Sequence, residues 1–295
     1  IVPQIHDCTY YNKPPLYNWI LAGSISIFNS MEEWAIRIPG ILSVILTALA
    51  IFYVSKRFVQ HETAVLAALF YLTSADLFFY GTVNAGEIDL FYSLIVTLQA
   101  FSIFLFHHKK KYGWLFLVSY FLAAVGTLTK GIPSVAFQGI TLFAVLLYHR
   151  EWKWLFHWKH FSGIALYLLI VGGYFLLYSF RDNSIGFILN LLNESSSKSA
   201  NAYGISEIMH QLFFFPLQLI KLMAPWTLLL VFLLRKSIVQ KIKTNPLVLF
   251  SALFITTNMI IYWISPNVRN RYLYMFFPFF MIFIVHWNSF NLNAV

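Results

Sequence analysis

The chain has 295 residues, of which 59% are hydrophobic and only 11% are charged, against about a quarter charged in a typical soluble domain. A soluble fold of this length could not bury so much apolar surface, so the composition excludes a soluble globular protein and predicts an integral membrane protein. One cysteine, Cys8, excludes an internal disulfide and a cysteine-based metal site, and basic loops facing lipid headgroups account for the net charge of +9 without nucleic acid.

In chain order, the segment 16–29 is apolar but too short to cross a bilayer, which favours an interfacial helix lying on the membrane. The apolar runs that follow are continuous rather than alternating, which predicts helices. We expect an all-α, polytopic bundle of about nine spans, with an outer region at 1–34, a transmembrane domain at 35–288 and the start of a further part at 289–295. The predicted spans are 35–54, 63–82, 89–106, 112–129, 132–148, 161–180, 208–234, 246–264 and 272–288.

Basic residues between the spans predict the orientation. Four clusters carry 12 of the 20 Lys and Arg residues, and two spans separate each cluster from the next, so all four are expected on the cytoplasmic side. The clusters are Lys56–Arg57, Lys109–Lys111, Arg150 with Lys153 and Lys159, and Arg235–Lys236 with Lys241 and Lys243.

Several other ionisable residues fall on the opposite, outer side. Charges near a membrane are costly and usually functional, so their convergence predicts an outer site for an anionic ligand. The acids are Asp7, Glu32, Glu33, Asp76, Glu87, Asp89, Asp182, Glu194 and Glu207, and the bases are Lys13, Lys130, Arg181, Lys198, Arg269 and Arg271.

Three outer motifs each allow two interpretations. Lys13 precedes Pro14 and Pro15, which fix a stiff bend; its ammonium either binds a lipid phosphate or snorkels at a helix start. Lys130, before Gly131 and Pro133, lies in a tight outer turn and is either a ligand or a topological residue. Asp89 either caps its helix or orients a sugar hydroxyl or a substrate ammonium through its charge.

A fourth motif precedes the last span. Arg271 and Tyr272 either bind phosphate, through paired guanidinium hydrogen bonds and a phenol, or belong to an aromatic belt with flanking charge. Arg181, followed by Asp182 at the end of another span, is a weaker version of the same pattern.

Together these stretches resemble the GT-C membrane glycosyltransferases, in particular the aminoarabinose transferases and their relatives among the protein mannosyltransferases (glycosyltransferase family 39). The matching segments follow the family order and cover nearly the whole chain. They are Lys13–Tyr17, Arg37–Pro39, Leu128–Gly131, Ala224–Trp226 and Arg271–Leu273 followed by Pro278.

The resemblance implies a transferase that takes a sugar from a polyprenyl phosphate at the outer face and passes it to a lipid, glycan or protein acceptor. It implies a bacterial inner membrane and a site facing the periplasm. By position, Lys13, Lys130, Arg181 and Tyr272 match the family's phosphate-binding residues, and Asp89 matches a supporting acid. Further candidates are Tyr10, Glu87, Lys198 and Arg271.

Two departures from the family pattern matter. The resemblance allows a divalent metal, but the family has an acid directly before the lysine of the Lys-Pro motif, where this chain has Asn12, so no metal ligand is assigned and no cofactor is certain. The family's main catalytic acids precede the position of Ile1, so we expect a fragment of a longer protein that is inactive alone.

Two other function classes remain open on the sequence. A transporter or flippase for an anionic or lipid-linked substrate would carry ionisable groups at the bilayer midplane and internal repeats. An oligosaccharide polymerase or ligase would carry long outer loops with histidine and arginine.

Overall fold

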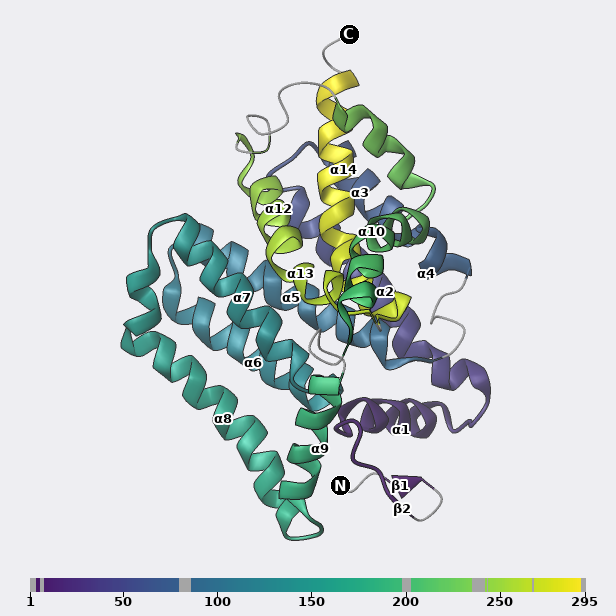
Figure 1. Ribbon diagram of the computed structural model, residues 1–295, viewed down its shortest axis with the longest axis vertical. Helices are drawn as coiled ribbons and strands as arrows, with labels where there is room; N and C mark the ends of the chain where they lie inside the picture. Colours follow the sequence, from purple (N-terminus) through teal and green to yellow (C-terminus); the bar gives the residue numbers. More distant parts are fainter. Residues whose placement is uncertain are drawn as a thin grey trace.

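A computed structural model describes residues 4–5, 8–79, 86–197, 203–234, 242, 244–266 and 268–292. The described chain is a bundle of helices of different tilt, preceded by a short β-ribbon near the N-terminus (Figure 1). In the ribbon, Gln4 lies opposite Thr9 and Ile5 opposite Cys8. The elements are β1 (Gln4–Ile5), β2 (Cys8–Thr9), α1 (Leu16–Phe28), α2 (Glu33–Ser55), α3 (His61–Leu72), α4 (Ala75–Phe79), α5 (Ile88–His108), α6 (Tyr112–Lys130), α7 (Pro133–Tyr148), η1 (Trp152–Phe156), α8 (Trp158–Ser179), α9 (Ser184–Ser197), α10 (Ile205–Leu222), η3 (Trp226–Leu234), α12 (Pro246–Asn258), α13 (Ile260–Trp263), η4 (Asn270–Phe276) and α14 (Phe277–Leu292).

Five helical segments in the described residues are long and apolar enough to cross a membrane. They are α2, α5, α6, α8 and the continuous pair α12–α13, which correspond to five of the nine predicted spans. The predicted span 132–148 is present as α7 but is shorter, and the predicted interfacial helix is present as α1.

Three of the predicted spans are interrupted. The run 63–82 ends as α3 at Leu72, since the Thr73 and Ser74 hydroxyls donate to backbone carbonyls one turn back and the Ala75 N–H donates to the Ala224 carbonyl at 2.8 Å. The run 208–234 divides into α10 and η3 at Pro225, which cannot donate a helical hydrogen bond. The run 272–288 begins in the 3₁₀ helix η4. Apolarity alone therefore overestimated how continuous these helices are.

Local sequence explains where the helices around the outer turns begin and end. Helix α6 ends at Lys130 because Gly131 has φ +98°, which other residues rarely adopt, and α7 then begins with Pro133 in its first turn. Gly86 likewise has φ +61°, and its carbonyl accepts a hydrogen bond from the Tyr17 hydroxyl at 3.0 Å. Because α5 and α6 are antiparallel and joined at 109–111, both turns lie at the same end of the bundle, where the start of α5 meets the end of α6.

The core surrounds α5 and α14, whose side chains are buried on almost every face. Helix α8 is different, because it buries only Gly163, Tyr174 and Tyr178. Its exposed residues include Leu168, Leu169, Leu176 and Leu177, and Phe143 of α7 is also exposed. An apolar helix face without protein cover is expected to face lipid.

The described basic clusters meet at one end of the bundle, as the orientation argument requires. The ring of Phe58, next to the first cluster, packs on His108, next to the second. Glu151, next to Arg150 of the third cluster, accepts a hydrogen bond from Lys110 of the second. Apart from the backbone at 242, the stretch 235–243 with the fourth cluster lies outside the described residues.

Candidate active site

A buried ion pair forms the centre of the candidate site. Asp89 is the second residue of α5 and Lys130 is the last residue of α6, and the Lys130 ammonium donates to the Asp89 carboxylate. The Asp89 side chain is 1% exposed and that of Lys130 is 9% exposed. Removing a charge from water costs several kcal/mol, so each of these two residues can be buried only because the other compensates its charge.

Arg271 of η4 joins two acids at the same place. Its guanidinium donates to Glu87, the residue before α5, and its Nε lies 3.3 Å from the Asp89 Oδ2 atom. The Asp89 carboxylate therefore contacts two cations, Lys130 and Arg271, so it does more than cap its helix. Glu87 Oε2 is buried and has no hydrogen-bond partner among the described residues.

Aromatic rings surround the lysine. The Lys130 ammonium lies 4.0 Å from the centre of the Tyr272 ring and 4.9 Å from that of Tyr92. A cation over the face of an aromatic ring is attracted by its quadrupole, and this attraction strengthens when water is excluded. The rings thus help to hold a charged lysine in an apolar place.

A cavity of about 390 Å³ opens beside this cluster. Lys13, Lys130 and Tyr272 bring polar atoms to it, whereas most of the remaining wall is apolar. A space with cationic groups and apolar walls suits a ligand that combines an anionic group with a hydrocarbon chain. The other wall residues are Gly131, Ile132, Pro133, Ala136, Leu191, Glu194, Ser195, Ile261, Tyr262, Ile264, Ser265 and Val268.

The segment that carries Lys13 is attached to the turn between α8 and α9. The Tyr11 hydroxyl lies 3.2 Å from both carboxylate oxygens of Asp182, and the Asn190 amide donates to Asn12 at 3.2 Å. Asp182 also accepts from the backbone N–H of Asn183 at 2.7 Å; this bond, before the others, lowers the pKa of Asp182. Pro14 and Pro15 are buried, so the bend predicted for Lys13 is fixed on both sides.

The structure brings together Lys13, Lys130, Tyr272, Asp89, Glu87 and Arg271, and leaves other candidates apart. Arg181 is exposed in the α8–α9 turn and does not line the cavity. Tyr10 is half-buried between β2 and α1 and does not line it either. Lys198 lies outside the described residues, as do Asn84 and Ala85 of the loop before Glu87.

Sequence reasoning missed one wall of the cavity. Residues 184–197 were expected to be an outer loop, but they form α9, which supplies Leu191, Glu194 and Ser195. The sequence did contain a signal: Asn183 is of a type that favours a helix start, and Phe187 and Leu191 are spaced for one helix face. In the structure the Asn183 side chain accepts a hydrogen bond from the Gly186 N–H at 2.8 Å.

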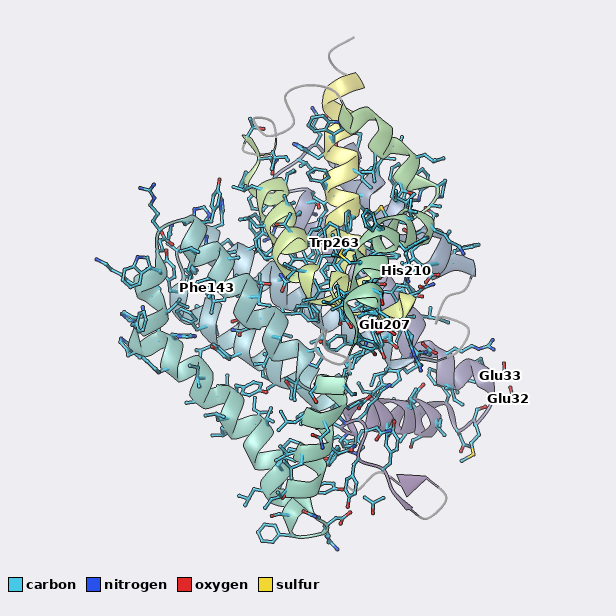
Figure 2. All side chains as sticks on the ribbon, viewed as in Figure 1. Glu32, Glu33, Phe143, Glu207, His210 and Trp263 are labelled. Carbon is cyan, nitrogen blue, oxygen red and sulfur yellow. The ribbon has the colours of Figure 1, made fainter. Side chains whose placement is uncertain are left out.

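The predicted outer acids do not all converge. Glu32 and Glu33 lie at the margin of the molecule, at the start of α2 (Figure 2). Glu33 there pairs with Arg37 at 2.5 Å on an exposed helix surface. Glu207 of α10 accepts a hydrogen bond from the Gly204 backbone N–H at 2.8 Å, which is a capping role.

The residues around Lys13 do not fit a divalent cation. Asn12 offers an amide oxygen that already accepts from Asn190, and the neighbouring Lys13 and Lys130 bring positive charge. In the part of the chain that the structure describes, no group of three or more His, Cys, Asp or Glu residues is arranged to hold a metal ion.

Known structures share this fold. The chain superposes on ArnT from Cupriavidus metallidurans bound to undecaprenyl phosphate with a TM-score of 0.76 and 19% identity, over 98% of this chain and 52% of that one. The apo state of the same protein gives a TM-score of 0.76 and 18% identity, over 98% of this chain and 51% of that one. The expected GT-C fold and helical membrane bundle are thereby confirmed.

Curated sequences give similar results. An uncharacterized protein of Aquifex aeolicus is 26% identical over 96% of this chain and 62% of its own length. The undecaprenyl phosphate-alpha-4-amino-4-deoxy-L-arabinose arabinosyl transferase of Edwardsiella ictaluri is 27% identical over 53% of this chain and 28% of its own length. The chain thus spans under two thirds of the length of these relatives.

The family assignment rests on the N-terminal and central part of the chain. The family described as dolichyl-phosphate-mannose-protein mannosyltransferase matches residues 12–175, from the segment of Lys13 through α8. The match includes Asp89 and Lys130, and the apolar helices agree with an integral membrane protein. Because it covers more than half of the residues, this chain belongs to the dolichyl-phosphate-mannose-protein mannosyltransferase family.

Proposed function

We propose that the full-length protein is a membrane glycosyltransferase that takes a sugar from a polyprenyl phosphate and passes it to a lipid, glycan or protein acceptor. We place it in a bacterial inner membrane with its site facing the periplasm. The observation that carries the proposal is the cavity beside Lys13, Lys130 and Tyr272, which combines cationic groups with apolar walls.

The residues suggest how the reaction is assisted. In the transfer, the bond between the anomeric carbon and the phosphate oxygen breaks, and the electron pair remains on the phosphate. Lys13 and Lys130 stabilise this negative charge, and the Tyr272 hydroxyl can donate to it. The bond to the acceptor oxygen forms at the same carbon. A hydroxyl acceptor gives its proton to a carboxylate of the full-length protein, whereas an anionic acceptor has no proton to lose.

The acids serve two different purposes in this proposal. Asp89 is paired with Lys130 and Arg271, so it orients the cationic groups and supports the reaction indirectly. Glu87 keeps one carboxylate oxygen without a partner among the described residues, and that atom can accept a hydrogen bond from a sugar or acceptor hydroxyl.

Transport fits these positions less well. Asp89 begins α5 and Lys130 ends α6, whereas transporters place such groups near the bilayer midplane. We therefore propose no second function.

The test is binding of undecaprenyl phosphate to the purified full-length protein, with undecaprenol, which lacks the phosphate, as the comparison ligand. Lys13 lines the cavity half-buried, and its side chain makes no hydrogen bond or ion pair with the described residues, so its removal breaks no internal contact there. We expect Lys13→Ala to weaken binding of undecaprenyl phosphate about 10- to 100-fold, the scale of one hydrogen bond to a charged group.

The control variant is Lys109→Ala, at the basic end of the bundle, which should leave binding unchanged. Affinity for undecaprenol should be the same in all three proteins. An unchanged affinity of Lys13→Ala for undecaprenyl phosphate would contradict the proposed site and return Lys13 to a snorkelling role.

A further inference from the structure

A second, smaller cavity lies at the basic end of the bundle, where α5, α7 and α12 meet. Its volume is about 130 Å³, room for about four water molecules. His107, His108, Lys110 and His149 line it on its polar side, and apolar side chains that include Phe104 and Phe250 form the rest. It is separate from the candidate active site, with which it shares no lining residue.

Two of the histidines are not committed to other polar groups. His108 makes ring contacts with Phe58 at 5.1 Å and Phe104 at 6.0 Å, and His149 makes one with His107 at 4.6 Å. Neither imidazole has a hydrogen bond within the described part of the chain, and both residues are exposed to the outside of the bundle. Their imidazoles are thus held by aromatic packing while their nitrogen atoms remain available to a ligand.

The charge around this cavity favours an anion. The two adjoining loops carry Lys109, Lys110, Lys111 and Arg150 against a single acid, Glu151. That acid is already neutralised by Lys110, at 2.7 Å, and bonded to His107 at 2.8 Å. Helix α12 also begins at Pro246, which lines the cavity, so the positive end of its dipole lies beside it.

The size, the depth and the apolar wall of this cavity favour the phosphate of a lipid over a soluble phosphate. A space of about 130 Å³ accepts a phosphate group, and the rest of a lipid headgroup would remain outside it. Helices α5 and α7 are apolar and end here, which places the cavity at the depth of lipid headgroups. Phe104, Phe250 and Leu253 offer contacts to the first carbons of a hydrocarbon chain that a soluble phosphate lacks.

We propose that this cavity binds the phosphate of an anionic phospholipid from the leaflet at the basic end, with His108 and His149 as hydrogen-bond donors. The bound lipid joins α5, α7 and α12 at their ends. This site does not depend on the proposed transferase function, because none of its residues belongs to the cavity beside Lys13.

The experiment is native mass spectrometry of the full-length protein in detergent, titrated with phosphatidylglycerol, phosphatidylcholine or inorganic phosphate. We expect phosphatidylglycerol to bind the wild type, and the double variant His108→Ala/His149→Ala to bind it about tenfold more weakly. A second variant, His149→Glu, keeps a polar surface residue but repels the phosphate and should reduce binding as strongly.

The matched control is Lys109→Ala/Lys111→Ala, which removes two nearby charges that do not line the cavity. It should weaken binding less than the histidine variants do. Equal affinity of the wild type and both histidine variants for phosphatidylglycerol would overturn the proposal. Binding of phosphatidylcholine as tight as that of phosphatidylglycerol would overturn the assignment to an anionic lipid. So would binding of inorganic phosphate that depends on the histidines and is as tight as that of the lipid.

Discussion

The two ends of the bundle each hold a carboxylate between two basic side chains, yet in different surroundings. At one end, Asp89 lies between Lys130 and Arg271, and its side chain is 1% exposed. At the other, Glu151 lies between Lys110 and His107, and its side chain is 24% exposed. The same chemical groups therefore occur once inside the protein and once near its surface.

The surface cluster satisfies every atom of its acid. Glu151 Oε1 accepts from Lys110 at 2.7 Å, and Oε2 from Tyr112 at 2.7 Å and His107 at 2.8 Å. Partial burial alone would raise the pKa of Glu151, but the hydrogen bonds from Lys110, Tyr112 and His107 outweigh it and hold the pKa at about 2. This cluster ties two loops together and leaves no oxygen of the Glu151 carboxylate without a partner.

The buried cluster is arranged differently. One of its cations, Lys130, lines a cavity, and one oxygen of Glu87 has no partner in the described structure. A buried ion pair is weak support for stability, because desolvation offsets most of the attraction. The surface cluster therefore stabilises the contact between two loops. The buried cluster instead holds charged groups in place for a ligand, and this lowers the stability of the fold.

The largest effect should follow from breaking the buried pair. Asp89→Asn keeps the shape of the side chain but leaves Lys130 buried without its opposite charge. We expect the free energy of unfolding of the full-length protein to fall by about 3 to 5 kcal/mol, measured by thermal or denaturant unfolding in detergent.

A double variant separates stability from function at this pair. Asp89→Asn/Lys130→Met removes both charges, so most of the lost stability should return, while binding of undecaprenyl phosphate should stay weak. If the losses in the free energy of unfolding were additive in the double variant, Asp89 and Lys130 would not be coupled. The buried cluster would then not differ from the surface cluster in the way described above.

A smaller effect is expected at the surface cluster. Glu151→Gln should lower the free energy of unfolding by about 1 to 2 kcal/mol, since it weakens three contacts that are partly exposed to water. Donor binding should not change, and a tenfold change in it would show that the two ends are coupled.

The same variant predicts a pH dependence. The pKa of Glu151 is lowered in the folded state, so its contribution is complete above the ordinary value of 4.5 and is lost as the pH falls toward about 2. The difference in melting temperature between wild type and Glu151→Gln should therefore shrink across that interval. A difference that stays constant there would contradict the role assigned to this carboxylate.

The smallest effect is expected for Tyr112→Phe. This change removes one hydrogen bond to Glu151 but keeps the ring, which stacks on Trp154 with centres 3.9 Å apart. We expect a loss of about 0.5 to 1.5 kcal/mol, measured as for Glu151→Gln. A loss larger than that of Glu151→Gln would mean that the tyrosine, and not the acid, holds these loops together.

Much of the fold follows from local sequence. The apolar runs at α2, α5, α6 and α8 predict helices because lipid leaves the backbone no other partner for its hydrogen bonds. Gly131 and Pro133 predict the turn that places Lys130, because their backbone preferences act within a few residues. Helix α9 was missed although Asn183, Phe187 and Leu191 offered a local signal. The interruption after Leu72 was missed because the contact of Ala75 with Ala224 comes from a distant part of the chain.

For the site, the sequence by itself determined which residues are charged in an apolar chain and at which helix ends they lie, including Lys13, Asp89, Lys130 and Arg271. Only the tertiary structure decided that Asp89 pairs with Lys130, 41 residues away, and that Arg271 reaches Glu87, 184 residues away. Composition and periodicity act along the chain, whereas the partner of a buried charge depends on which helix ends the packing brings within a few ångströms.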